Sequence, residues 1–556
     1  MELTVKQISS MHKVRISDRL DHPEITGRKV LAGQRLTYQV CLQADQQLFA
    51  GVSVHSALKE HVKVYWVKNA VMDRPVVLDV PMEDYITHEP GLMPDILVPM
   101  EESGWKIAPY KTPCTLWVRV DVPKDMQPGK YTVQLQFDVA QLNAVPAGTL
   151  TKTMEVEVLP AVMPEQQLTY TRWIYIDCIA GVHGVEIFSE AHWALMDKYI
   201  AYAKDAGINM LLVPVHTPPL DTEVGTRRPC VQLVDIEKIG DKYIFGFEKF
   251  HRYIDLCKKH GIRYFEIAHL FSQWGAAYAP NILVTENGKA EYMFGWHVKA
   301  DDPEYIAFLK QYIAAIVKAL EAEGISENTY FHISDEPKLE NMEKYKAAAD
   351  IIRPLIGKSR TCDALSDYAF YEKGLVECPI TAIQHIKPFL EHPAANQWLY
   401  YCCLPQDTYP NGFMAMPSYR ARVLGFLMYK YGIKGFLHWG FNFYNGCRSM
   451  YTVDPYITTS CDGAFPSGDA FIVYPGKNGV YGSIRGEMTY EAIQDMNICF
   501  ALEKVIGRDA VVKMIDDAAG GALLFDRFPR SYEYLENLRR QMLEGITGNC
   551  PDEGRN

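Results

Sequence analysis

The sequence lacks the signatures of several common enzyme classes. It contains no GxGxxG turn after the first strand-like run of its second half, no GxSxG, no HxH, no HExxH and no CxxC. These absences argue against a doubly wound dinucleotide-binding sheet, a nucleophilic serine hydrolase and a metal-dependent hydrolase. We therefore expect neither a metal ion nor an organic cofactor.

Basic charge and long apolar runs are also scarce. The 56 Lys and Arg residues are outnumbered by 68 Asp and Glu residues, giving a formal net charge of -12 at pH 7. Nucleic acids and anionic membranes attract basic surfaces, so we expect neither as a partner. The N-terminal stretch MELTVKQISSMHKV lacks the apolar core of a signal peptide, and no apolar run approaches a membrane span. These features predict a cytoplasmic protein.

The cysteines do not form a disulfide pattern. There are thirteen, an odd number, scattered along the chain. Cys402 and Cys403 are adjacent, an arrangement that rarely permits a disulfide. We predict reduced and mostly buried thiols.

The first part of the chain, residues 1–165, reads as an all-β domain. At 556 residues the chain is long enough for two domains. Short runs with period-two alternation recur here without a long helical pattern, at 36–44, 62–70, 115–122, 128–139 and 151–160. Several strands at short spacing predict a β-sandwich.

Residues 166–556 have a different pattern, in which strand-like runs alternate with amphipathic helical segments. The runs lie at 171–177, 209–215, 264–270, 330–336, 360–365, 380–385, 399–404 and 435–441. Alternating β and α units favour a parallel sheet, and eight of them predict an α/β domain built as a (β/α)8 TIM barrel. Helical patterns after residue 486 predict a helical C-terminal segment packed on the barrel.

The fourth of these runs ends in two acids. The apolar run at 330–333 leads into Asp335, Glu336 and Pro337. Two like charges at the mouth of a barrel are costly unless they are solvated or paired. Pro337 predicts an extended Glu336 and suits the first turn of the next helix. Capping of that helix is the alternative interpretation, and it explains one acid better than two.

Paired carboxylates without metal-ligand spacing are typical of glycosidic bond cleavage. In most glycosidases two acids flank the bond, roughly 5 to 9.5 Å apart. Consecutive residues do not easily span a sugar, which favours a route in which the sugar's own 2-acetamido oxygen attacks. Asp335 would then stabilise the acetamido nitrogen of the oxazolinium ion, and Glu336 would protonate the leaving oxygen and later activate water.

Aromatic residues follow other predicted strands at the same rim. Trp274 and Trp439 suit stacking on the apolar face of a sugar, although a buried barrel tryptophan is an equal alternative. Tyr401 suits a hydrogen bond to the acetamido oxygen. Its neighbour Tyr400 points to the opposite side of the strand, so we expect only one of the two to face the site.

Three polar residues complete the predicted rim. Asp177, at the end of the first run, and His216, after the second, are candidate ligands of sugar hydroxyls. Support of a loop is the alternative role of His216. Asn442 follows the last run and is a further candidate hydroxyl ligand.

Several segments resemble glycoside hydrolase family 123. They are FHISDEP (331–337), WLYYCCLPQDTYPN (398–411), GFLHWGFNFYN (435–445), GDAFIVYPG (468–476), SIRGE (483–487) and, near the N-terminus, YITHEPGLMPDILVPM (85–100). The resemblance covers nearly the whole chain. It implies an exo-acting retaining β-N-acetylgalactosaminidase that uses the substrate-assisted route, with Asp335 as the acetamido stabiliser and Glu336 as the general acid/base. The implied substrate is a glycan or glycolipid with terminal β-GalNAc.

Two other functions stay open at this point. One is a β-N-acetylhexosaminidase of different specificity, since a single axial hydroxyl is discriminated by loop geometry. The other is a glycan-binding barrel without catalysis. The presence of both acids favours an enzyme over a binding protein.

Overall fold

The structure is a computed structural model, which describes residues 3–77, 84–141 and 145–548. Its internal contacts divide the chain into two compact units. Unit 1 comprises Met1–Gln167, Gln406–Lys430 and Tyr481–Asn556, and unit 2 comprises Leu168–Pro405 and Tyr431–Val480. The predicted partition assigned everything after residue 165 to the barrel, whereas these contacts group the C-terminal helices with the N-terminal strands.

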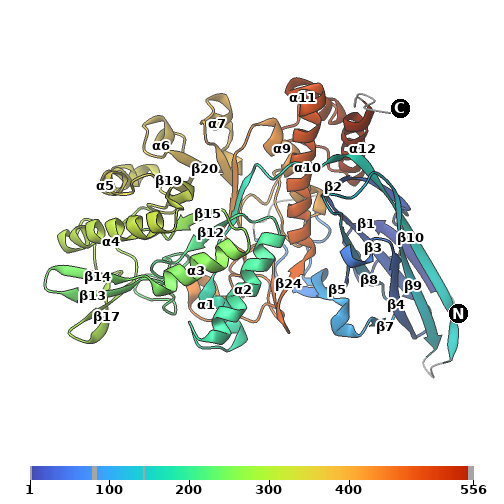
Figure 1. The fold of residues 1–556 in the computed structure, drawn as a ribbon, viewed down its shortest axis with the longest axis horizontal. Coiled ribbons are helices and arrows are strands. Elements are labelled where there is room, and N and C mark those ends of the chain that lie inside the picture. Colours follow the sequence, from blue (N-terminus) through green and yellow to red (C-terminus); the bar gives the residue numbers. More distant parts are fainter. Residues whose placement is uncertain (1–2, 78–83, 142–144, 549–556) are drawn as a thin grey trace. The chain divides into compact units, whose positions relative to one another are not determined.

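Unit 2 is built on the predicted (β/α)8 barrel, which the structure confirms (Figure 1). Its parallel strands are, in order, β11 (Thr169–Arg172), β12 (Met210–Val213), β15 (Tyr264–Ile267), β18 (Thr329–Phe331), β19 (Arg360–Leu365), β20 (Cys378–Ala382), β21 (Trp398–Tyr400) and β22 (Gly435–His438). β22 closes the barrel by pairing with β11, with Tyr170 opposite Phe436. The strands are almost wholly buried, as expected for parallel strands that are covered on both faces.

Helices connect most of these strands. They are α1 (Ile176–His183), α2 (Glu190–Asp205), α3 (Glu248–Lys259), α4 (Pro303–Ala322), α5 (Met342–Ile352), α6 (Ala369–Glu372) and α7 (Lys387–Glu391). The start of α4 illustrates why they form where they do. The Asp302 carboxylate accepts the backbone N–H of Glu304 at 2.8 Å, and Pro303 occupies the first turn. The loops after β12 and β15 add a small sheet that the sequence analysis does not predict. Its strands are, in order, β14 (Lys242–Gly246), β13 (Asp235–Ile239), β16 (Ile282–Glu286) and β17 (Lys289–Phe294).

Unit 1 contains two sheets that share one hydrophobic core. The first runs β1 (Leu3–Ser9), β3 (Arg35–Ala44), β8 (Cys114–Asp121), β5 (Val62–Met72) and β6 (Gly91–Pro99). Gly482 and Ser483, at the end of β24 (Gly479–Ser483), pair with β6. The second runs β2 (Gly27–Ala32), β10 (Pro146–Val162), β9 (Gly129–Gln141), β4 (Leu48–Ser56) and β7 (Lys106–Ile107). Along β9, Val133, Leu135 and Phe137 are fully buried at every second position, which confirms the alternation in the sequence.

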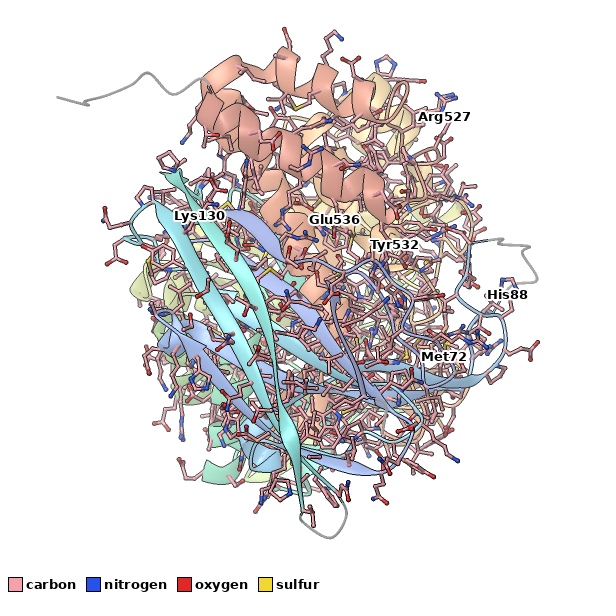
Figure 2. The ribbon with its side chains drawn as sticks, turned by 90° about the vertical axis from the view of Figure 1, so that its right-hand side faces the viewer. Met72, His88, Lys130, Arg527, Tyr532 and Glu536 are labelled. Atoms are coloured by element: carbon pink, nitrogen blue, oxygen red, sulfur yellow. The ribbon has the colours of Figure 1, made fainter. Side chains whose placement is uncertain are left out.

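Helices complete unit 1. They are α8 (Ser418–Arg422), α9 (Leu424–Lys430), α10 (Ile484–Ile506), α11 (Arg508–Ala518) and α12 (Tyr532–Gly548). Lys130 on β9 and Glu536 on α12 mark the strands and the helices of the unit in Figure 2. α9 and α10 cross at Gly425, where an added Cβ would lie 2.0 Å from the carbonyl oxygen of Ala492. Only glycine permits this close approach. No helix in the described part of the chain is long and apolar enough to cross a membrane.

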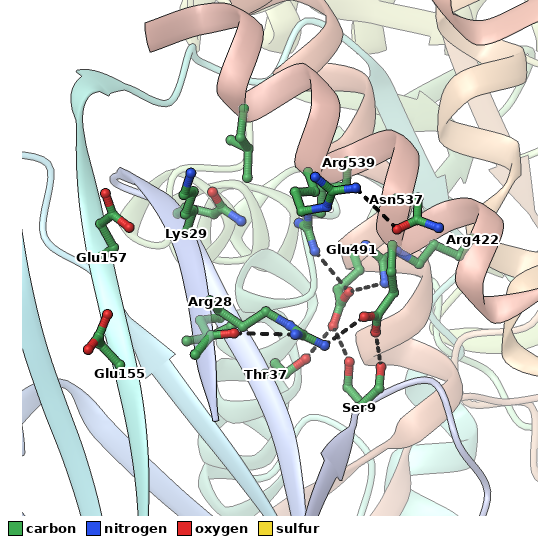
Figure 3. Close-up of a pocket in the computed structure, with 17 residues that line it drawn as sticks. Ser9, Arg28, Lys29, Thr37, Glu155, Glu157, Arg422, Glu491, Asn537 and Arg539 are labelled. Carbon is green, nitrogen blue, oxygen red and sulfur yellow. Dashed lines mark hydrogen bonds and ion pairs between the residues drawn. The ribbon is translucent and has the colours of Figure 1, made fainter. Parts of the chain in front are cut away.

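A buried acid ties the strands and helices of unit 1 together. Glu491 on α10 accepts hydrogen bonds from Ser10 and Thr37 and ion pairs with Arg422 and Arg539, at 3.0 and 3.3 Å (Figure 3). Burial opposes the charge of Glu491, but the two guanidinium groups outweigh it and hold the pKa of this carboxyl below its usual value. The cluster lines a pocket of about 400 Å³.

Replacing this buried charge should destabilise the protein. We expect Glu491→Gln to lower the free energy of unfolding by about 3 kcal/mol, because it leaves Arg422 and Arg539 short of a counter-charge. Urea unfolding measures the difference, which should shrink as the pH falls through the lowered pKa of Glu491. Glu155→Gln, at an exposed position of the same pocket, is the control and should change stability by less than about 0.5 kcal/mol. Equal effects of the two variants would contradict the assignment.

Candidate active site

A pocket of about 160 Å³ lies at the C-terminal ends of the barrel strands. Four of the predicted site residues line it: Asp335, Glu336, Trp274 and Trp439. Its remaining lining residues are Trp173, Tyr175, Leu220, Asp221, Gln273, Ala364, Tyr400, Cys402, Cys403, Leu437 and Phe465. All of them belong to unit 2.

The backbone of the acidic pair is clamped from both sides. Trp274 donates its N–H to the carbonyl oxygen of Asp335 at 2.9 Å, and Glu336 donates its N–H to the carbonyl oxygen of Ala364 at 3.1 Å. Glu336 has a φ of 43°, so the extended conformation predicted from Pro337 is wrong. The following helix also begins later than predicted, since α5 starts at Met342. The left-handed backbone is strained for a glutamate, and the two clamping hydrogen bonds hold it in place.

A tyrosine holds the second acid. The hydroxyl of Tyr400 donates to Glu336 Oε1 at 2.5 Å. Burial, followed by the charge of Glu336, raises the pKa of Tyr400 well above its usual value, which keeps the hydroxyl a donor. The expectation that one of two adjacent tyrosines faces the site holds, but the choice of Tyr401 is wrong. Tyr401 is buried away from the pocket, with its ring 5.1 Å from that of Phe436.

The first acid resists ionisation. Asp335 is partly buried in the pocket wall, and burial, with the neighbouring charge of Glu336, raises the pKa of Asp335 well above its usual value. The two carboxyl groups therefore do not readily carry two charges together. A hydrogen-bond donor supplied by a ligand would favour the ionised form of Asp335.

A fully buried ionic network lies in the barrel interior. Glu266 on β15 accepts hydrogen bonds from the hydroxyl of Thr171, from Trp173 Nε1 at 2.9 Å and from His332 Nε2 at 2.8 Å. Trp173 also lines the pocket. The network therefore reaches the pocket through the indole of Trp173.

The other side of the network holds the strand end that carries the acids. Asp363 on β19 accepts the backbone N–H of Ile333 at 3.0 Å, the hydroxyl of Tyr345 at 2.5 Å and His332 Nδ1 at 3.3 Å. Both ring nitrogens of His332 thus face carboxylates. Burial opposes its charge, but the Cys362 thiol and these two carboxylates raise the pKa of His332 well above its usual value. His332 is therefore placed to donate from both ring nitrogens to carboxylates.

One group of described residues has the spacing of a metal site. His269, His332 and Asp363 offer ligand atoms within 4.8 Å of one another. The two imidazole rings are stacked, with centroids 4.2 Å apart and planes at 20°. Lone pairs in stacked rings run parallel rather than converging on one ion, and both nitrogens of His332 already bind carboxylates. The arrangement suits an ionic network better than a metal centre.

Three predicted ligands lie outside the pocket. Asp177 lies in α1, because β11 ends at Arg172, and its carboxylate is buried in an ion pair with Arg228 at 2.5 Å. His216 is fully buried and donates through Nε2 to the carbonyl oxygen of His269 at 2.9 Å. Burial lowers the pKa of His216 to about 4.

Asn442, the third, is also buried. Its side chain accepts from the N–H of Tyr175 at 2.8 Å and donates to the carbonyl oxygen of Tyr175 at 3.0 Å. Asn442 therefore positions a pocket residue instead of contacting a ligand. All three residues lie beyond the ends of their strands, since β11 ends at Arg172, β12 at Val213 and β22 at His438.

The sequence analysis missed a set of polar groups that face the pocket. The Tyr175 hydroxyl, Asp221 Oδ2 and Gln273 Nε2 are buried and, among the residues that the structure describes, have no hydrogen-bond partner. The N–H of Asp221 donates to Gln273 Oε1 at 2.7 Å, which fixes the orientation of that amide. Burial raises the pKa of Asp221 to about 6. Unpaired buried polar groups are costly unless a ligand satisfies them.

Comparison with known proteins identifies the family. Residues 173–502 match glycoside hydrolase 123, catalytic domain. The chain belongs to this family. It is a glycoside hydrolase, and the pocket at Asp335 and Glu336 is its candidate active site. No curated protein matches the chain.

One solved structure shares the fold over the length of the chain. A family 123 glycoside hydrolase from Clostridium perfringens, described for glycolipid glycan hydrolysis, aligns with a TM-score of 0.73 at 16% identity and covers 98% of both chains. A family 2 member from Bacteroides cellulosilyticus (TM-score 0.28, 11% identity, 74% of this chain and 44% of that chain) matches far more loosely. So does a family 5 mannosidase from Rhizomucor miehei (TM-score 0.35, 12% identity, 62% and 94%).

The raised pKa of Asp335 predicts that this residue costs stability. The folded protein holds the Asp335 proton more tightly than the unfolded chain, so stability is lost as the pH rises above the unfolded pKa, about 3.9. We expect Asp335→Asn to stabilise the protein by about 0.5–2 kcal/mol at pH 7 and to have little effect below about pH 4. Denaturation at the two pH values measures this, with the exposed Asp255→Asn as control. A destabilised variant at pH 7 would contradict the electrostatic interpretation.

Proposed function

We propose that this protein is an exo-acting retaining β-N-acetylgalactosaminidase that uses substrate-assisted catalysis. The observation that carries the proposal is the adjacent pair Asp335 and Glu336, both lining one small pocket in a family 123 barrel. Because both acids leave the backbone at one point of the rim, they are poorly placed to flank a sugar from opposite sides. The nucleophile is then the 2-acetamido oxygen of the substrate.

The proposed steps assign one role to each acid. The Asp335 carboxylate accepts the acetamido N–H and stabilises the positive charge that develops as the acetamido oxygen attacks the anomeric carbon. Glu336 gives its proton to the departing glycosidic oxygen. It then takes a proton from water, which opens the oxazolinium ion from the opposite face and restores the β configuration. Tyr400 holds one oxygen of Glu336, so the transferred proton resides on the other.

Other pocket residues fit a sugar ring. Trp274 and Trp439 supply aromatic faces for the apolar side of the ring. The Tyr175 hydroxyl and Gln273 Nε2 are donors, and Asp221 Oδ2 is an acceptor, for the ring hydroxyls. Buried polar groups whose partner is a substrate hydroxyl reject analogues that lack the matching hydroxyl.

The galacto configuration and the terminal β-GalNAc substrate rest on the family. The Clostridium perfringens relative, described for glycolipid glycan hydrolysis, supports a glycan or glycolipid as the class of substrate. The small pocket supports removal of a single terminal sugar, because its volume of about 160 Å³ holds no long oligosaccharide.

Kinetics on aryl β-glycosides test the proposal. We expect the β-GalNAc glycoside to be cleaved faster than the GlcNAc, galactose and glucose glycosides. Glu336→Gln should reduce kcat by roughly 10²–10⁴-fold, whereas Glu340→Gln at an exposed position of the next turn should not. Full activity of the Glu336 variant would refute the catalytic assignment.

A thiazoline mimic of the cyclic intermediate tests the route separately. It should inhibit the protein strongly, and Asp335→Asn should weaken its binding because the carboxylate that pairs with the ring nitrogen is gone. Cleavage of aryl glycosides without inhibition by the thiazoline would exclude the substrate-assisted route while leaving the hydrolase intact.

A variant of Asp221 distinguishes two possible roles of this residue, binding of a sugar hydroxyl and nucleophilic attack on the sugar. If Asp221 binds a hydroxyl, Asp221→Asn should lower kcat/KM by roughly 10–200-fold, the effect of losing a charged hydrogen bond of about 1.5–3 kcal/mol. Thiazoline inhibition should persist in that variant. A different pair of results would instead make Asp221 a nucleophile of the protein. In that case the Asp221→Asn variant would no longer cleave the glycosides, and the thiazoline would not inhibit the unmodified protein.

A further inference from the structure

Two adjacent thiols form part of the wall of the active-site pocket. Cys402 and Cys403 both line it, together with Glu336 and Tyr400, and their Sγ atoms are 3.8 Å apart. Cys402 donates its backbone N–H to the carbonyl oxygen of Leu404 at 3.0 Å, which fixes a tight turn directly after β21. The sulfur pair is therefore held in place by the chain that also carries Tyr400.

This spacing does not suit a disulfide. Adjacent Cα atoms lie about 3.8 Å apart across a trans peptide, shorter than the roughly 4.4–6.8 Å that disulfides usually span. The sulfur atoms would also have to approach to about 2.05 Å. Closure would require the turn to rearrange, so the pair is poorly suited to oxidation as a switch.

The same spacing suits one bridging metal ion. Two thiolates bound to a tetrahedral ion at about 2.3 Å each lie about 3.8 Å from one another. We propose that Cys402 and Cys403 form a binding site for a thiophilic d10 cation, such as Zn²⁺ or Cd²⁺, in the wall of the substrate pocket. Each metal–sulfur bond replaces an S–H bond, so two protons leave to solvent for each ion bound, and water completes the coordination.

Such an ion would block hydrolysis. It would place the ion and its bound water in the pocket that contains Glu336, and these would occupy space that a sugar needs. This consequence rests on the proposed function, whereas binding of the ion does not. Hard cations such as Mg²⁺ prefer oxygen ligands and should not occupy the site.

Titration of the full chain with Cd²⁺ tests the site without an activity measurement. We expect a thiolate-to-cadmium charge-transfer band that saturates at one ion per chain, with two protons released. Cys402→Ser and Cys403→Ser should each lose this band, whereas Cys447→Ser, at an exposed cysteine outside the pocket, should retain it. Equal bands in all four proteins would overturn the proposal. If a serine variant fails to fold, the corresponding alanine variant replaces it.

Inhibition tests the consequence. Added Zn²⁺ should strongly reduce the activity of the parent and of Cys447→Ser, each relative to its own activity without Zn²⁺. A chelator should restore the activity. The same relative activity should change by less than twofold in the two pocket variants, whatever their basal rates. If Cd²⁺ binds but Zn²⁺ does not inhibit, the claim that a bound ion blocks the pocket is refuted. Loss of glycosidase activity on every substrate would refute the proposed function but leave the spectroscopic result intact.

Discussion

The placement of His332 between the carboxylates of Glu266 and Asp363 is the interaction on which the rest of the site depends. All three side chains are fully buried in the barrel, where an uncompensated charge would be very costly. Each carboxylate accepts from two further groups: Glu266 from Thr171 and Trp173, and Asp363 from Ile333 and Tyr345. Because Asp363 also binds the N–H of Ile333, the network fixes the strand end from which the catalytic pair extends.

The pocket next to this network contains residues with strained backbone conformations and buried polar atoms that lack hydrogen-bond partners in the described part of the chain. Glu336, Trp274 and Asp221 all have left-handed backbone angles, and all three line the pocket. Backbone hydrogen bonds from neighbouring strand ends hold Trp274 and Glu336 in these conformations. The same pocket contains polar atoms of Asp221, Gln273 and Tyr175 that have no hydrogen-bond partner among the described residues. Such groups are costly unless a ligand satisfies them.

A buried carboxylate is stabilised by positive partners and destabilised without them, and each of the two units contains one of these cases. In unit 1, Glu491 is buried but surrounded by guanidinium and hydroxyl groups, and its charge stabilises the packing of α10 against the strands. In unit 2, burial and then the neighbouring carboxylate of Glu336 raise the pKa of Asp335, so its charged form is disfavoured. A fully paired acid is structural, whereas an acid left beside another acid is available for chemistry.

The sequence alone determines the parts of this protein that depend on local periodicity. Period-two runs specify the strands of unit 1, eight alternating β and α patterns specify the barrel, and the acids after 330–333 must emerge at the C-terminal end of β18. Tertiary structure decides which side chains enter the pocket. Alternation requires one of Tyr400 and Tyr401 to face inward without saying which. Asp177, His216 and Asn442 lie beyond strand ends shorter than the apolar runs suggest, and Tyr175 and Asp221 reach the pocket from loops. The direction of a side chain after a strand ends depends on the path of its loop and on distant hydrogen-bond partners, neither of which has a periodic signature.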